Sequence, residues 1–224
     1  MSTSERTITA LSAQKRNPER INVYLDGEFA FGLARIVAAW LRVGMALSEE
    51  RVRKLREEDA LEKARLSALR LISIRPRSTE EVRRRLEKQG FAAEEIDIAV
   101  MRLRESGLLG DAAFASAWVD NRTTFRPRGR RLLTLELRQK GVDGQTIEQV
   151  MQDLPDEESL AYESGLRAAK RLAGEDWETF RRKLSGSLGR KGFSYETVAT
   201  VVRRIWQEMH ADPARDDEYE EMNQ

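Results

Sequence analysis

The chain has 224 residues, of which 40% are hydrophobic, and this excludes a largely disordered protein. Lysine and arginine total 39 against 38 acidic residues, so the net charge of +1 excludes a uniformly basic protein and makes local clusters more informative. The absence of cysteine excludes disulfides, thiolate zinc sites and cysteine nucleophiles. No apolar run approaches the roughly 20 residues of a membrane span, and the N-terminus lacks a signal-peptide pattern. We therefore expect a cytoplasmic protein with no membrane partner.

Residues 21–31 have the pattern of a β-hairpin. Asp26 and Gly27 separate two runs of alternating residues, and this dipeptide supplies the positive φ values of a two-residue type I′ turn. The turn predicts cross-strand pairs of Tyr24 with Phe29 and of Asn22 with Phe31.

A lone hairpin is marginal in water, so further elements are expected around it. Residues 7–11 predict a third strand, and residues 34–42 predict a helix that covers one face. Ser48 is a candidate N-cap for the next helix, whose charged run over residues 49–59 is most simply a connector.

Three glycines, Gly90, Gly141 and Gly192, recur at a spacing of 51 residues and indicate a threefold repeat. Each follows a leucine four residues earlier and precedes an apolar residue, as at a left-handed helix C-terminus where the next side chain packs back. Other apolar positions recur at the same spacing: Val82, Leu133 and Leu184; Ile96, Ile147 and Val198; Val100, Met151 and Val202; Leu103, Leu154 and Ile205.

Each repeat is predicted to hold three helices. The first helices cover residues 60–74, 111–125 and 157–173, and two of them end before an Arg-Pro-Arg tripeptide, because proline disfavours helix in the residue before it. The third repeat lacks this tripeptide. Ser78, Asp143 and Ser194 are candidate N-caps for later helices.

The fold class predicted is mainly α: a tandem array of three three-helix repeats with a small N-terminal β-hairpin or three-stranded element. The expected divisions are residues 1–47 for the β element and short helix, 48–59 for a helical connector, 60–110, 111–155 and 156–210 for the repeats, and 211–224 for an acidic disordered tail.

Basic residues cluster around the corner of the middle repeat, where residues 120–140 hold seven basic residues against two acidic ones. Residues 167–191 have the same surplus, eight against three. Such clusters suit a polyanion or an acidic protein groove, although each can equally be a solvated helix face. The residues inferred from charge to bind a partner or DNA are Arg75, Arg77, Arg122, Arg126, Arg128, Arg130, Arg131, Arg138 and Lys140.

No pattern in the chain indicates an enzyme. His210, the sole histidine, falls at the end of the last predicted helix, and acidic pairs fall near helix starts, where they favour the helix dipole. Trp118, Phe114 and Phe125 share a predicted helix and are expected to pack in a core rather than stack on bases. We expect no catalytic residue, cofactor, metal or small-molecule substrate.

The second repeat, with Asp111-Ala-Ala-Phe-Ala115, Glu136-Leu137 and Lys140-Gly141, resembles the RecX family of bacterial recombination regulators. The first repeat adds an Arg-Pro-Arg tripeptide and a Gly90-Phe91 pair, and the resemblance covers residues 60–210. It implies a cytoplasmic protein that binds the RecA recombinase, lies in the groove of its filament on DNA, and restrains strand exchange and filament growth.

Two functions remain open at this stage. The first is a non-catalytic regulator of RecA filaments, with single- or double-stranded DNA as a further candidate partner. The alternative is a stand-alone nucleic-acid-binding module, since helical units with arginines at their corners can grip phosphates directly.

Overall fold

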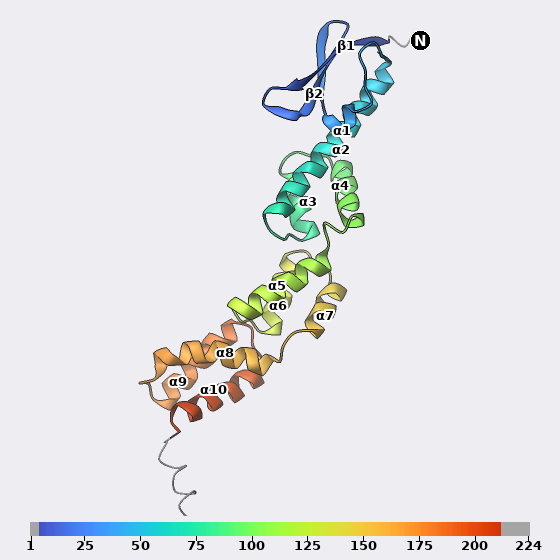
Figure 1. Cartoon of the computed structure of the whole chain (residues 1–224). Helices are drawn as coiled ribbons and strands as arrows, with labels where there is room; N and C mark the ends of the chain where they lie inside the picture. Colours follow the sequence, from blue (N-terminus) through green and yellow to red (C-terminus); the bar gives the residue numbers. More distant parts are fainter. Residues whose placement is uncertain (1–4, 212–224) are drawn as a thin grey trace, which may run out of the picture. The chain divides into compact units, whose positions relative to one another are not determined.

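The computed structural model describes residues 5–211 and divides into two compact units, Met1–Gly110 and Asp111–Gln224 (Figure 1). The first unit holds an antiparallel sheet and a three-helix bundle, and the second holds two three-helix bundles. The predicted mainly helical fold with three three-helix repeats and a small N-terminal sheet is confirmed. Of the predicted acidic tail, residues 212–224 lie outside the described residues.

The N-terminal sheet has four strands in the order β3-β2-β1-β4, and each neighbouring pair is antiparallel. The predicted turn is confirmed, because Asp26 and Gly27 have φ values of 52° and 92°. The predicted third strand is also present. The strands are β1 (Arg6–Gln14), β2 (Asn17–Leu25), β3 (Glu28–Ala34) and β4 (Ala46–Leu47).

The hairpin register is confirmed at one pair and wrong at the other. Tyr24 pairs with Phe29 as predicted, but Phe31 lies opposite Val23, since the register shifts between the two pairs. The shift is a β-bulge, which places an additional residue on one strand and turns later side chains to the other face. Phe29 therefore stays 60% exposed while Phe31 enters the core at 8%.

The helix predicted for residues 34–42 is shorter, because α1 covers only Arg35–Ala38. The chain then returns to the sheet: Gly44 N donates to Ile8 O at 2.8 Å, and Ile8 N donates to Met45 O at 2.9 Å. These bonds to β1 compete with helix continuation. They also lead into β4, which the sequence pattern did not indicate.

Residues that the sequence divides between a connector and a first helix form one continuous helix, α2 (Glu49–Ile74). Ser48 caps it as predicted, accepting a hydrogen bond from Arg51 N at 3.2 Å. Its first half packs beside the sheet and its second half packs with α3 (Thr79–Glu87) and α4 (Ala93–Glu105) (Figure 1). The charged connector is therefore a structural element shared by the sheet and the bundle.

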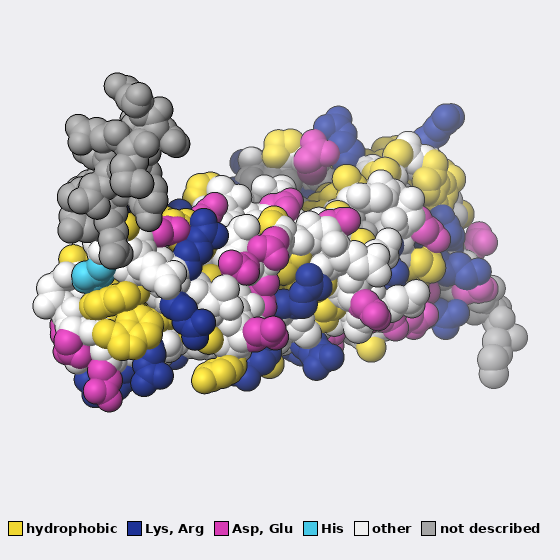
Figure 2. All heavy atoms as spheres, turned by 90° about the horizontal axis from the view of Figure 1, so that it is seen from below, with side chains coloured by type: hydrophobic (Ala, Val, Ile, Leu, Met, Phe, Trp, Pro, Cys, Tyr) yellow, Lys and Arg dark blue, Asp and Glu magenta, His cyan; other side chains and the backbone are white. Residues whose placement is uncertain are grey.

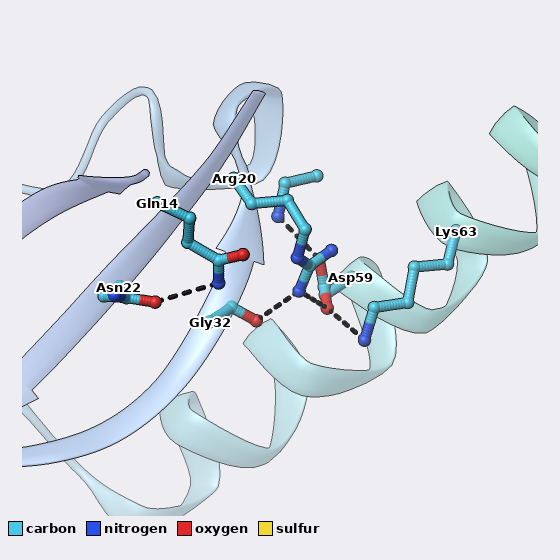
Figure 3. Close-up of polar contacts among 7 residues, drawn as sticks. Gln14, Arg20, Asn22, Gly32, Asp59 and Lys63 are labelled. Carbon is cyan, nitrogen blue, oxygen red and sulfur yellow. Dashed lines mark hydrogen bonds and ion pairs between the residues drawn. The ribbon is translucent and has the colours of Figure 1, made fainter. Parts of the chain in front are cut away.

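A buried carboxylate, Asp59 on α2, joins this helix to the sheet (Figure 3). Its oxygens accept hydrogen bonds from the backbone N–H of Ala34 at 2.6 Å and from Arg20 Nη2 at 3.0 Å, and Lys63 Nζ lies 2.8 Å away. Arg20 also donates to Gly32 O at 2.7 Å. Burial raises the pKa of Asp59, but the hydrogen bonds from Arg20, Lys63 and Ala34 outweigh it and hold that pKa below its ordinary 3.8.

We predict that Asp59→Asn lowers the free energy of unfolding by about 2–3 kcal/mol at neutral pH, because it removes one partner of a largely buried ion pair. A carboxyl whose pKa is lowered by folding stabilises the protein above its ordinary pKa and loses that effect as the pH falls through the lowered value. The difference from wild type should therefore shrink below pH 3.8 in urea denaturation followed by circular dichroism. A difference that is the same at pH 7 and pH 3 would contradict this role.

The second unit buries one continuous apolar core that includes side chains from both of its bundles. The helix predicted for residues 111–125 is confirmed with the same bounds. The helices are α5 (Asp111–Phe125), α6 (Arg130–Gln139), α7 (Gly144–Gln152), α8 (Glu157–Ala169), the short 3₁₀ helix η1 (Lys170–Leu172), α9 (Trp177–Arg190) and α10 (Tyr195–Met209).

The glycine turns predicted from the repeat are confirmed, with φ values of 86°, 79° and 86° at Gly90, Gly141 and Gly192. In each, the residue after the glycine donates to the carbonyl of the leucine five residues earlier, at 3.3, 3.1 and 3.5 Å. The predicted N-caps are confirmed too: the side chains of Ser78, Asp143 and Ser194 accept from the backbone N–H three residues later.

Inside the second unit, the start of α6 touches the turn between α9 and α10. Gly129 N donates to Lys191 O at 2.9 Å, and a Cβ atom added to Gly129 would lie 2.2 Å from Gly192 O. A Cβ atom added to Gly192 would lie 2.4 Å from Leu132 Cβ. Glycine at both positions is therefore what allows the middle and last repeats to pack so closely.

We predict that Gly129→Ala lowers the free energy of unfolding by about 2 kcal/mol or more, because the methyl group meets backbone that cannot move aside cheaply. Gly144→Ala is the matched control, since a Cβ atom there meets nothing within 4 Å. It should be neutral or slightly stabilising. Equal melting midpoints for the two variants would show that the junction is not tightly packed.

Candidate functional site

The second unit carries a basic surface made by α6, α9 and α10. Two adjoining depressions of about 830 and 750 Å³ share Arg131, Gly189, Phe193 and Tyr195. Among the described residues that line them, Glu157 is the one acid. We use the name basic surface for the exposed arginines of these depressions other than Arg130: Arg131, Arg138, Arg181, Arg182, Arg190 and Arg203.

The arginines of the basic surface have no ion-pair or hydrogen-bond partner among the described residues 5–211. The single acid, Glu157, is already engaged. It accepts hydrogen bonds from Arg130 N at 3.1 Å and Thr197 Oγ1 at 3.2 Å. The surface therefore presents positive charge that the described fold does not neutralise, as an anionic partner requires.

Aromatic side chains lie among these charges. Tyr195, the first residue of α10, is 90% exposed, and Trp177, the first residue of α9, is 38% exposed. The Trp177 ring packs against Trp206, with ring centroids 5.4 Å apart. Figure 2 shows hydrophobic side chains beside the histidine, with lysine and arginine side chains close by. Exposed aromatic rings beside arginines are typical of binding surfaces.

Of the residues inferred from charge, Arg122 and Lys140 surround a tryptophan of the second unit. Arg122 Nε and Trp118 Nε1 both donate to Glu136 Oε2 at 2.8 Å. The Arg122 guanidinium and the Lys140 ammonium lie 4.4 and 5.0 Å from the Trp118 ring centroid. These contacts give both residues a part in holding α5 and α6 together.

Arg75 and Arg77 have intramolecular partners in the first unit. Arg75 forms an ion pair with Glu81 at 3.3 Å, and Arg77 Nε donates to Leu71 O at 3.0 Å. The second bond satisfies a carbonyl in the last turn of α2, so the Arg-Pro-Arg corner also serves as a helix end.

The remaining arginines inferred from charge, all in the middle repeat, lie in three different surroundings. Arg130 lines one depression of the basic surface, but its Nη1 donates to Met151 O at 2.8 Å. Arg131 and Arg138 belong to the basic surface. Arg126 and Arg128 line a different, smaller pocket between α5, α8 and α9. The structure therefore brings only part of the inferred set together.

Sequence reasoning noted the cluster in residues 167–191 but missed Arg203 and Tyr195. Arg203 lies on the exposed side of α10, in a helix whose apolar stripe drew attention to its buried side. Tyr195 is the first residue of α10 and directly follows the N-cap Ser194. A hydrophobic residue next to a cap and outside the apolar stripe is the signal that could have identified it.

The described residues contain no group of three or more histidine, cysteine, aspartate or glutamate side chains that could hold a metal ion. His210 stacks on Trp206, with ring centroids 3.7 Å apart, and its Nδ1 lies 2.9 Å from Trp206 O. These contacts explain the position of the histidine by packing. The described structure thus combines tandem three-helix repeats with an open, arginine-rich surface.

Four family models match the chain in sequence order. The N-terminal domain of regulatory protein RecX matches residues 6–48, and the first, second and third three-helix domains of RecX match residues 64–103, 111–151 and 156–202. The chain belongs to the RecX family of regulatory proteins, which is not an enzyme family.

Curated relatives and solved structures agree with this assignment. Regulatory protein RecX of Bacillus licheniformis is 32% identical over 203 residues, which are 88% of this chain and 76% of the relative. That of Bacillus pumilus is 30% identical, over 89% of this chain and 77% of the relative. A crystal structure of regulatory protein RecX matches 88% of this chain and 98% of its own, with a TM-score of 0.72 and 25% identity. RecX from Lactobacillus salivarius, at 23% identity and a TM-score of 0.60, supports the fold over 66% of this chain and 97% of its own.

No helix within residues 5–211 is both long enough and apolar enough to span a bilayer.

We predict that Arg122→Ala and Arg131→Ala separate structural from partner-binding arginines. Arg122→Ala should lower the free energy of unfolding by about 1–2 kcal/mol, because Glu136 loses a charged hydrogen-bond donor and Trp118 loses a cation–π contact. Arg131→Ala removes an exposed side chain and should change it by less than about 0.5 kcal/mol. Urea denaturation measures both, and equal losses would refute this division.

Proposed function

We propose that this chain binds the RecA recombinase and RecA–DNA filaments, and inhibits filament growth, DNA-dependent ATP hydrolysis and strand exchange in recombination, DNA repair and the SOS response. Membership of the RecX family of regulatory proteins supports the regulatory role. We choose the basic surface of the second unit as the interface because its arginines lack partners within the described fold.

The geometry favours a large anionic partner over a small molecule. Both depressions are open and adjoin, and they share Arg131 and Tyr195 at their border. An extended contact of this kind suits an acidic protein groove, where exposed arginines gain hydrogen-bonded partners and Tyr195 gains an apolar neighbour. An extended, acidic partner fits this surface, and in our proposal the RecA filament on DNA is that partner.

A stand-alone nucleic-acid-binding protein is the second candidate function. The same arginines can contact phosphates, and the aromatic rings can stack on bases. The two functions differ in one measurable respect, the affinity for bare single-stranded DNA relative to RecA-coated DNA. Preference for the coated form supports the filament regulator, and indifference to RecA supports the alternative.

We predict that the double variant Arg131→Glu with Arg182→Glu keeps its helical circular-dichroism spectrum but loses inhibition of RecA ATPase. Half-inhibition should need at least about tenfold more protein, because reversing a charge at a desolvated interface costs roughly 2 kcal/mol or more. The readouts are DNA-dependent ATP hydrolysis and strand exchange at stoichiometric protein.

The matched control is Arg102→Glu with Arg104→Glu, which makes the same change of net charge at exposed positions on α4 in the first unit. It should inhibit like the wild type. Full inhibition by the Arg131 and Arg182 variant would move the interface away from the basic surface. A wild-type protein without effect on RecA would refute the proposed function itself.

A further inference from the structure

A small pocket lies in the second unit, separate from the basic surface. It has a volume of about 230 Å³ and is lined at the end of α5 by Phe125, Arg126, Pro127 and Arg128, and on its other side by Ser164, Arg167 and Lys191. Four of these residues are cationic, and none is acidic. The hydrogen bond from Gly129 N to Lys191 O holds the two sides of the pocket together.

Two of the cations, Arg128 and Lys191, are partly buried in surroundings that disfavour a positive charge. Arg128 Nε is buried and has no hydrogen-bond partner among residues 5–211. The Lys191 ammonium donates to the hydroxyl of Ser164, a side chain that is 1% exposed. Burial lowers the pKa of Lys191, and the charges of Arg128 and Arg167 lower it further.

Such an arrangement costs stability in the unliganded protein. A buried N–H without an acceptor loses its hydration without compensation, and like charges around a confined space repel one another. An oxyanion in the pocket would remove both costs, since its oxygens accept from Arg128 and its charge offsets the neighbouring cations. The lining of the pocket therefore suits an anion.

We propose that this pocket binds a backbone phosphate of single-stranded nucleic acid, and that Phe125 stacks on an adjacent base. A strand suits the site better than one carboxylate does, because four cations exceed the charge of a single carboxylate while a strand brings successive phosphates. Phe125, one of the residues that line the pocket, is 68% exposed. An exposed ring beside phosphate-binding cations matches the way single strands are held.

Phe125 was expected from the sequence to pack in the core with Phe114 and Trp118. Phe114 is buried and Trp118 packs against the core, but Phe125 lies at the last position of α5 and remains exposed. The exposed ring is therefore available to stack on the base of a bound strand.

The first experiment uses inorganic phosphate and the full chain, without RecA. Phosphate should raise the melting midpoint of the wild type above that in chloride at the same ionic strength, because it binds only the folded state. Arg128→Met should abolish this rise while keeping a midpoint in phosphate-free buffer at least as high as that of the wild type. The control is Arg171→Met, which removes an exposed positive charge from the same unit but outside the pocket. This variant should keep the phosphate-induced rise in melting midpoint.

The outcomes distinguish an Arg128 that binds an anion from an Arg128 that stabilises the fold. A lower midpoint of Arg128→Met in phosphate-free buffer would assign Arg128 to folding and overturn the proposal. So would a wild type that responds equally to phosphate and chloride.

The second experiment tests the strand with a fluorescent oligo-dT by anisotropy. Arg128→Met should weaken binding at least about fivefold and lower the slope of log affinity against log salt by roughly one, as expected for a lost phosphate contact. Phe125→Ala should weaken oligo-dT binding about fivefold or more and leave the phosphate-induced rise unchanged. Phe29→Ala, which removes an exposed ring from the first unit, is its control.

Equal oligo-dT affinity for Arg128→Met and wild type would overturn the assignment to a strand and leave free phosphate as the ligand, and equal affinity for Phe125→Ala and wild type would overturn the stacking of Phe125 on a base. The proposal rests on the proposed function only in that both place an anionic partner on the second unit. Because RecA is absent from both assays, failure here leaves the RecA interface untouched. Conversely, a protein that ignores RecA can still bind the strand.

Discussion

Neither Gly129 nor Gly192 has room for a Cβ atom, because one added at Gly129 would meet the Gly192 carbonyl and one added at Gly192 would meet Leu132. The contact joins the start of α6 to the turn between α9 and α10, with the hydrogen bond from Gly129 N to Lys191 O at its centre. Residues on either side of it face different surfaces. Arg128 and Lys191 line the small pocket, whereas Arg131 and Tyr195 line the basic surface. Both candidate sites therefore depend on one backbone contact that only glycine permits.

This dependence explains why residues far apart in the sequence act as neighbours. Lys191 and Arg128 belong to different repeats, and each repeat has its own turn glycine and caps. The apolar core is nevertheless shared between the repeats, so the second unit behaves in packing terms as one body. Charges that repel across the junction are held in place by that core. Apolar burial at this scale can offset the cost of a few unfavourable charges.

The sequence predicted what local rules control. The turn glycines, the caps Ser78, Asp143 and Ser194, and the Asp26-Gly27 turn were all confirmed, because each depends on residues within a few positions. Long-range contacts were not predictable in this way. The hydrogen bonds that Ile8 accepts from Gly44 and donates to Met45 shorten α1, and Asp59 in a charged run is buried by partners about 25 to 39 residues away. Counting charges likewise could not distinguish a structural arginine from one free to bind a partner. Arg122 donates a hydrogen bond to Glu136, whereas Arg131 has no partner in the described fold.

The continuous helix α2 sets a fixed length within the first unit. Its 26 residues correspond to about 39 Å from end to end, at 1.5 Å per residue. Asp59 fastens its earlier part to the sheet, and Ala68 and Leu71 fasten its later part to the bundle. The helix therefore fixes the distance between the sheet and the bundle. A macromolecule that touched both would need contact points with the same spacing. Inserting a single residue into α2 would rotate the contacts on one side of the insertion by about 100° relative to those on the other.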